Sequence, residues 1–199
     1  GVQLNYNTAV TWYTRAAKQG LSIAQNNLGL MYKIGQGVPL NYKIAIKWYK
    51  LAAKQGDANA QFNLGLMYFK GQGVHQDFKI AAKWYVRAAE QGLANSQSDL
   101  GTMYLQGKGV PQNSETAFKW FSLAAKQGLS RAQFNLGTMY AQGQGVPRDN
   151  AAALKWYIRA ADLGFVVAQY NLGLMYMQGQ GVPQDNKIAV KWYTLAAEQ

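Results

Sequence analysis

The sequence contains no cysteine, a single histidine, four prolines and only nine acidic residues among its 199 positions. The absence of cysteine excludes disulfides, thiol catalysis and cysteine-ligated metals. The lone histidine, His75, is predicted to lie exposed in a loop, and a metal site needs several ligands. No apolar run approaches the roughly 18 residues that cross a bilayer. We therefore expect no catalytic residues, no metal, no cofactor and no transmembrane segment.

Most of the charged residues are basic. Twenty lysines and arginines give a net charge of +11, and 49% of the residues are hydrophobic. Such a chain folds, and its basic surface attracts an acidic protein, anionic lipid or nucleic acid. Both ends fall inside a repeating unit, so we interpret the sequence as a fragment, and the absence of a targeting segment carries no information.

An internal repeat organises the whole chain. The tryptophans recur every 36 residues, and the 21 glycines fall at four positions of that period, represented by Gly1, Gly20, Gly29 and Gly35. A fixed period of this length indicates stacked supersecondary units. We divide one continuous stack into units 1–36, 37–72, 73–108, 109–144 and 145–180, and a half unit, 181–199. The six tryptophans are Trp12, Trp48, Trp84, Trp120, Trp156 and Trp192.

Each unit contains two predicted helices. The tryptophan helix, for example residues 77–90, follows an Asn or Asp that can cap its free N–H groups and stops at a glycine. The Leu-Gly helix, for example residues 60–68, stops at a Gly-x-Gly-Val loop that proline usually ends. The predicted caps are Asn5, Asn41, Asp77, Asn113, Asp149 and Asp185.

The spacing also predicts how the helices pack. Ala9, Trp12 and Ala16 lie three and four residues apart, on one helix face. Stacking should bury every tryptophan except those at the ends. Gly29 costs about 1 kcal/mol in mid-helix relative to alanine. We expect a neighbouring helix to approach it closely, with the Ala16–Ala17 pair as the facing surface.

Three motifs carry a family resemblance: Ala-Gln-x-Asn-Leu-Gly-x-Met-Tyr, Gly-x-Gly-Val-Pro and Ala-x-Lys-Trp-Tyr-x-x-Ala-Ala. They closely resemble the Sel-1-like repeat of the tetratricopeptide-like superfamily, with His75 and Phe121 as small departures. The resemblance implies an all-α, right-handed α/α superhelical solenoid of 36-residue helix-turn-helix repeats. It also implies a non-catalytic scaffold or adaptor that binds a peptide or partner domain in a concave groove. Bacterial members further suggest the periplasm, the cell envelope or secretion.

Motifs for catalysis are missing. No serine stands three residues before a lysine, Gly-x-Ser-x-Gly is absent, and the Gly-Gln-Gly-Val loops lack the spacing of phosphate-binding motifs. A cell-envelope or β-lactam-related enzyme is therefore an alternative that no residue supports.

In related solenoids the first helix of each pair lines the groove, and by resemblance this is the Leu-Gly helix. Its asparagines have two open interpretations, a ligand contact or a hydrogen bond to the neighbouring unit. Its apolar residues change from unit to unit, which suits recognition of a partner. The predicted groove residues are Asn27, Phe62, Asn63, Leu66, Phe69, Phe134, Asn135, Tyr170, Asn171 and Met177.

A lysine recurs at one position of the tryptophan helix. It marks either a solvated face or a contact stripe for acidic protein, lipid headgroups or nucleic acid. A nucleic-acid-binding repeat that uses this face is the second function hypothesis. Against it, the chain has few arginines, and the positions that would face bases do not carry a pattern of polar residues that could read them. The end faces should also stack between molecules. The stripe comprises Lys47, Lys83, Lys119, Lys155 and Lys191.

Overall fold

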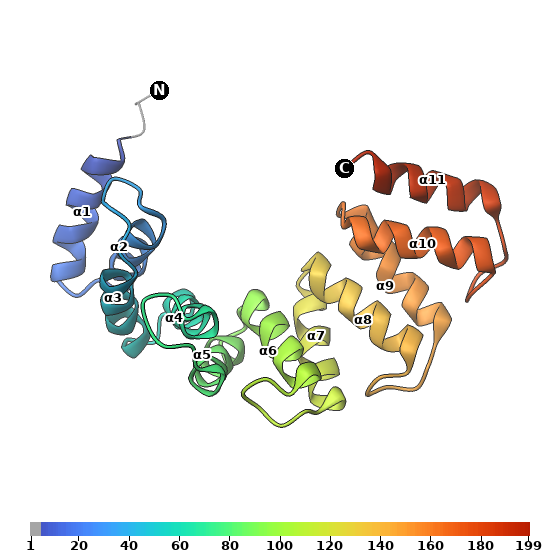
Figure 1. Ribbon diagram of the computed structural model, residues 1–199, viewed down its shortest axis with the longest axis horizontal. Coiled ribbons are helices and arrows are strands. Elements are labelled where there is room, and N and C mark those ends of the chain that lie inside the picture. Colours follow the sequence, from blue (N-terminus) through green and yellow to red (C-terminus); the bar gives the residue numbers. More distant parts are fainter. Residues whose placement is uncertain (1–4) are drawn as a thin grey trace. The chain divides into compact units, whose positions relative to one another are not determined.

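The computed structural model describes residues 5–199, which form eleven α-helices and no strand (Figure 1). Gly1 lies outside the described residues. Odd-numbered helices are the predicted tryptophan helices and even-numbered helices are the Leu-Gly helices, which confirms the predicted all-α repeat fold. The helices are α1 (Tyr6–Lys18), α2 (Ser22–Ile34), α3 (Tyr42–Lys54), α4 (Ala58–Lys70), α5 (Phe78–Glu90), α6 (Ala94–Gln106), α7 (Ser114–Lys126), α8 (Ser130–Gln142), α9 (Asn150–Asp162), α10 (Val166–Gln178) and α11 (Asn186–Ala197).

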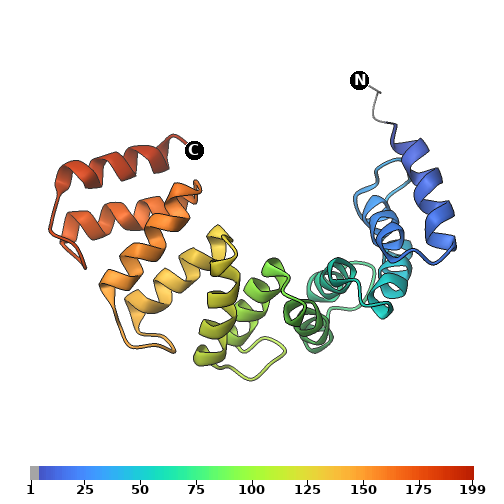
Figure 2. The same cartoon turned by 180° about the vertical axis from the view of Figure 1, so that it is seen from behind.

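The helices group into two compact units. The N-terminal unit comprises the residues up to Ser96 with Lys108–Val110, and the C-terminal unit comprises Gln97–Gly107 with Pro111–Gln199. Each has buried clusters of its own. Seen from behind in Figure 2, α9, α10 and α11 lie side by side in the C-terminal unit.

Local sequence sets the helix ends. The predicted caps are confirmed: Asn5 accepts from the amide of Thr8 at 3.1 Å and Asp77 from that of Ile80 at 2.9 Å. Gly35 ends α2 with φ of +74°, a left-handed conformation that glycine adopts without a steric penalty. Its N–H donates to the carbonyl of Met31 at 2.9 Å. These short-range bonds give all helices but α11 the same length of 13 residues.

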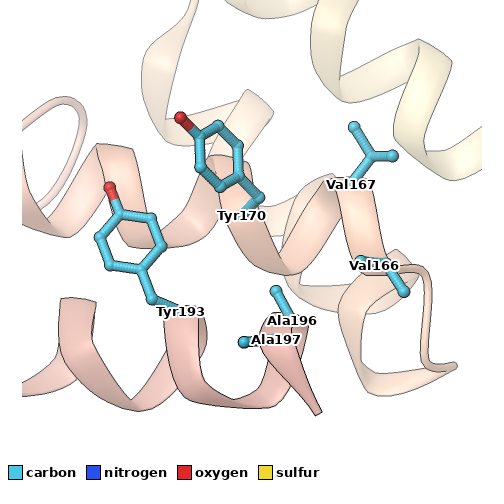
Figure 3. Close-up of a pocket in the computed structure, with 6 residues that line it drawn as sticks. All are labelled: Val166, Val167, Tyr170, Tyr193, Ala196 and Ala197. Carbon is cyan, nitrogen blue, oxygen red and sulfur yellow. The ribbon is translucent and has the colours of Figure 1, made fainter. Parts of the chain in front are cut away.

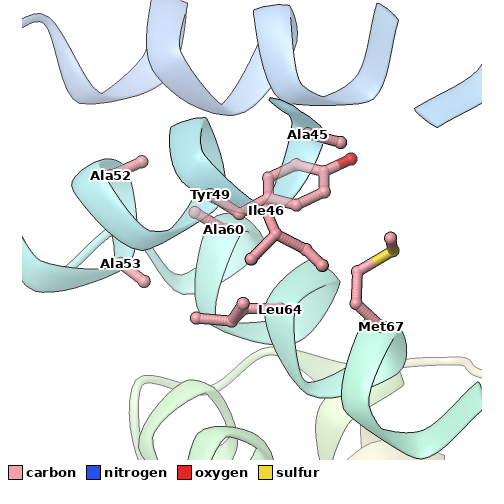
Figure 4. Close-up of a cluster of buried hydrophobic side chains, with 8 residues drawn as sticks. All are labelled: Ala45, Ile46, Tyr49, Ala52, Ala53, Ala60, Leu64 and Met67. Atoms are coloured by element: carbon pink, nitrogen blue, oxygen red, sulfur yellow. The ribbon is translucent and has the colours of Figure 1, made fainter. Parts of the chain in front are cut away.

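The buried face of the tryptophan helices differs from the predicted one. In α3 the fully buried residues are Ala45, Tyr49 and Ala52, so the tyrosine after the tryptophan occupies the core (Figure 4). Trp84 packs only at the edge of this cluster and is half-buried. Trp12, at the end of the stack, is 62% exposed as expected. The prediction of fully buried inner tryptophans is therefore wrong.

The mid-helix glycines explain why the tyrosine takes this place. A Cβ on Gly29 would lie 2.7 Å from Cε1 of Tyr49, and one on Gly65 equally close to Cδ1 of Tyr85. The predicted close approach is confirmed. Its partner is the flat tyrosine ring of the next tryptophan helix, so the expected contact with the Ala16–Ala17 pair is wrong.

A buried glutamine near the start of each Leu-Gly helix links successive helices. Nε2 of Gln25 donates to the carbonyl of Ala17 at 3.1 Å, and its Oε1 accepts from Nε2 of Gln55 at 2.8 Å. The pairs Gln91 to Gln61 and Gln127 to Gln97 repeat this bond at 2.7 and 2.9 Å. Sequence reasoning missed these pairs, although both glutamines recur with the 36-residue period.

Candidate interaction surfaces

The predicted groove residues lie on even-numbered helices, in two groups. The N-terminal group is Asn27 on α2 and Phe62, Asn63, Leu66 and Phe69 on α4. The C-terminal group is Phe134 and Asn135 on α8 and Tyr170, Asn171 and Met177 on α10.

In the N-terminal unit, the aromatic groove residues also support the fold. The ring of Phe62 stacks on Tyr85 with centroids 5.6 Å apart. Phe69 meets Phe78 edge-on at 5.1 Å and lies 6.4 Å from Tyr85. Both phenylalanines are half-buried as a result. Only part of each ring is left for a partner.

In the C-terminal unit, exposure increases from α8 to α10. Phe134 is half-buried between Tyr157 and Phe165, at 5.6 and 5.2 Å between centroids. Tyr170 packs on Tyr193 at 5.6 Å but remains 51% exposed. Met177, about two turns further along the same face of α10, is 40% exposed. The face of α10 therefore offers the most accessible of the predicted aromatic groove residues.

Two hollows flank this face of α10. The larger is apolar, has a volume of about 530 Å³, and lies between α10 and α11 (Figure 3). Val166, Val167 and Tyr170 line it from α10, and Tyr193, Ala196 and Ala197 from α11.

The smaller hollow, about 190 Å³, has a mixed lining. Asn171, Leu174 and Gln178 contribute to it from α10, and Ala141 from α8. An apolar hollow beside a few side-chain amides is the usual composition of a binding site. A ligand could bury an apolar group in the larger hollow and hydrogen-bond the amides of the smaller one.

The repeated asparagine position has different environments in different units. Nδ2 of Asn63 donates to Oδ1 of Asn26 in the preceding unit at 3.0 Å. Asp99, the exception in sequence, pairs with Arg131 of the following unit at 2.6 Å. Asn171 instead lines the smaller hollow. A bond to a neighbouring unit thus accounts for Asn63 and for Asp99, while Asn171 borders the smaller hollow.

The outer faces of the tryptophan helices carry the lysine stripe. All five predicted lysines of the stripe are exposed. Beside them, guanidinium groups stack on tryptophan rings in every second unit: Arg15 on Trp12, Arg87 on Trp84 and Arg159 on Trp156, at 5.1, 4.8 and 4.6 Å. The units between carry exposed leucines at the arginine position, Leu51, Leu123 and Leu195. Sequence reasoning missed this alternation, which is visible when every second unit is compared.

The described part of the chain shows few features of a metal site or of a membrane-spanning segment. Within residues 5–199, no three His, Asp or Glu side chains are placed to share a metal ion. His75 is exposed, and its Nδ1 lies 3.0 Å from the carbonyl oxygen of Gln76. None of the described helices is long and apolar enough to span a membrane.

Comparison with known families gives matches along the whole chain. The Sel1 repeat matches six times, at residues 1–21, 22–57, 58–93, 94–129, 130–165 and 166–199. A comparison with curated proteins finds no match.

Solved structures show the same fold. A Sel1 repeat protein from Oxalobacter formigenes is 39% identical with a TM-score of 0.92, over 97% of this chain and 77% of that one. The c5321 protein, a protective antigen present in uropathogenic Escherichia coli strains, is 38% identical with a TM-score of 0.93. That match covers 98% of this chain but 41% of the E. coli protein. The immunity protein Pa5087 from Pseudomonas aeruginosa, at 20% identity and a TM-score of 0.60, shares the fold alone.

Proposed function

Because this chain belongs to the Sel1 repeat family, whose members are typically protein-interaction scaffolds, we propose that it binds a peptide or partner domain on the face of its Leu-Gly helices, centred on α10. The observation that carries the proposal is the exposed ring of Tyr170 at the wall of an apolar hollow. The role is non-catalytic, in keeping with the general character of the family.

The energetics favour α10 over the other helices of this face. Binding energy at protein interfaces concentrates in a few aromatic anchors that become fully desolvated. Phe62 and Phe134 are already half-buried in the fold, so they have less area to bury on binding. Tyr170 keeps half of its surface exposed and lies next to Val166 and Val167.

The test uses peptides selected from a displayed library against the purified chain. Tyr170→Ala should weaken a selected peptide by about 2 kcal/mol, the size expected for truncating an aromatic anchor. Leu123→Ala is the matched control, because Leu123 is similarly exposed but lies on the outer face of α7. Isothermal titration calorimetry measures both affinities, and circular dichroism checks that both variants remain folded. Loss of binding in the Leu123 variant with full binding in the Tyr170 variant would place the site elsewhere.

A further inference from the structure

A separate hollow opens on the outer face of the N-terminal unit, between α1 and α3. Its volume is about 470 Å³. Tyr32, Ile44, Trp48 and Leu51 form apolar walls, and Lys18 and Lys47 also line it. It is lined from α1 and α3, with Tyr32 from α2, and by none of the residues around α10, so it goes beyond the function proposed above.

The charge around this hollow has no internal counterpart. Residues 5–70 contain eight lysines and arginines and a single acidic residue, Asp57. The carboxylate of Asp57 is engaged at the start of α4, where it accepts from the amide of Ala60 at 2.8 Å. Lys18 and Lys47 are both exposed. An occupant with negative charge would therefore be attracted without displacing an internal ion pair.

The hollow depends on the leucine of the Arg/Leu alternation. At the equivalent positions of other units, Arg87 and Arg159 stack over Trp84 and Trp156. Leu51 takes that position beside Trp48 and is 45% exposed. A side chain that would lie across the tryptophan is thus replaced by a short apolar one, and the space beside the indole stays open.

The equivalent pair of tryptophan helices, α9 and α11, has the leucine but not both lysines. Leu195 is present there, but Asp162 stands at the position of Lys18. We compared the described neighbouring tryptophan helices that lie within one compact unit. Among them, only α1 and α3 combine a leucine at the Arg/Leu position with lysines at the positions of Lys18 and Lys47.

We propose that this hollow binds an acidic peptide segment, which inserts one apolar side chain against Trp48 and Leu51 and places carboxylates near Lys18 and Lys47. Lysines alone would attract any polyanion, including nucleic acid and anionic lipid. The apolar walls between them add a requirement for an apolar group of side-chain size flanked by negative charge. An acidic peptide meets both requirements at once.

The probe is a blocked peptide with one leucine between two glutamates in a Gly-Ser background. The protein carries 5-fluorotryptophan, and Trp48→Phe assigns the Trp48 signal in the ¹⁹F NMR spectrum. We expect saturable movement of the Trp48 signal. Peptides with glutamine for glutamate, or glycine for leucine, should bind about tenfold more weakly or worse. No movement of the Trp48 signal at saturating peptide would overturn the proposal.

The variant Leu51→Arg tests whether the peptide binds in the open hollow or is held by positive charge alone. The variant copies the residue found in neighbouring units and adds a positive charge, so binding by charge alone would tighten. Occupancy of the hollow predicts instead that peptide binding falls about tenfold or more, because the guanidinium covers Trp48. Unchanged or tighter peptide binding by Leu51→Arg refutes the proposal.

Two further comparisons complete the test. Lys18→Glu and Lys47→Glu should each weaken peptide binding, whereas the matched charge reversal Lys191→Glu should leave it unchanged, as should Tyr170→Ala. Vesicles of anionic phospholipid and a single-stranded oligonucleotide serve as competing probes. If either displaces the peptide from the wild type and binds Leu51→Arg more tightly, the surface is a general polyanion site and the proposal is wrong.

Discussion

Oε1 of Gln133 is buried without a hydrogen-bond donor among the described residues, and Leu163 stands where that donor would come from. In other units the glutamine 30 residues further along the chain donates this bond, as Gln127 does to Gln97. Leu163 has no amide, and its side chain is 59% exposed. One substitution in the repeat thus leaves a buried acceptor unpaired and an apolar side chain in water.

Leu163→Gln should therefore stabilise the chain. Restoring the bond to Gln133 should raise the free energy of unfolding by about 1 kcal/mol, the usual net value of a hydrogen bond. Urea unfolding followed by circular dichroism measures the change. Leu163→Ala is the control, since it removes the exposed leucine without supplying a donor. Equal stabilisation by alanine and glutamine would show that the orphaned oxygen is not the cause.

Two buried tyrosines should respond in opposite ways to loss of their hydroxyl groups. The hydroxyl of Tyr49 has no hydrogen-bond partner among the described residues, and burial raises the pKa of Tyr49. The hydroxyl of Tyr157 lies 3.1 Å from Oγ1 of Thr138.

Tyr49→Phe should leave stability unchanged or raise it by up to about 1 kcal/mol, and Tyr157→Phe should lower it by a similar amount. Phe121 is buried at the same repeat position, so phenylalanine fits there. Thermal and urea unfolding of the two variants, compared with the wild type, measure these changes in stability. A loss of stability in Tyr49→Phe as large as in Tyr157→Phe would contradict this account.

The parts of the fold that depend on near neighbours in sequence were predictable. Asp77 caps α5 through a bond three residues away, and Gly35 ends α2 through its own backbone conformation. The 36-residue period then propagates these local rules along the chain, so the helix order follows from one unit. The close approach at Gly29 was predictable too, because a repeated cost in helix propensity needs a repeated compensation.

The packing partners were not predictable, because periodicity marks a residue as shared without saying which neighbour it meets. Tyr49 and Trp48 are adjacent and both recur in most units, and only the space opened by Gly29 decides that the tyrosine is buried. For the same reason, the sequence assigned Phe62 to a binding face without revealing its stacking on Tyr85. Whether the groove residues bind a partner stays a prediction.

Gly65→Ala should destabilise the chain despite the better helix propensity of alanine. Propensity alone would gain about 1 kcal/mol. The new Cβ would lie 2.7 Å from the buried ring of Tyr85, however, and overpacking of this kind costs about 1–3 kcal/mol. We expect a net loss in urea unfolding. In a Tyr85→Ala background the same change should become favourable, since the ring is gone, and a loss of equal size in both backgrounds would exclude the steric explanation.

Lys33→Met should stabilise the chain in a way that depends on pH. Burial, and secondly the charge of Lys70, lower the pKa of Lys33 from 10.5. The other units carry Phe69, Leu105, Ala141 and Met177 at this position. The folded state therefore disfavours the ammonium form, and the cost is present near neutral pH, where the lysine is charged whether the chain is folded or unfolded.

As the pH rises through the lowered pKa towards 10.5, the folded chain releases the proton first and the cost diminishes. The stability advantage of Lys33→Met over wild type should accordingly be largest near neutral pH and shrink towards pH 10.5. Urea unfolding across this range measures the difference, with the exposed Lys54→Met as the control for added apolar surface. A constant advantage at every pH would mean that methionine acts by packing alone, because only the loss of a desolvated charge makes the gain depend on titration.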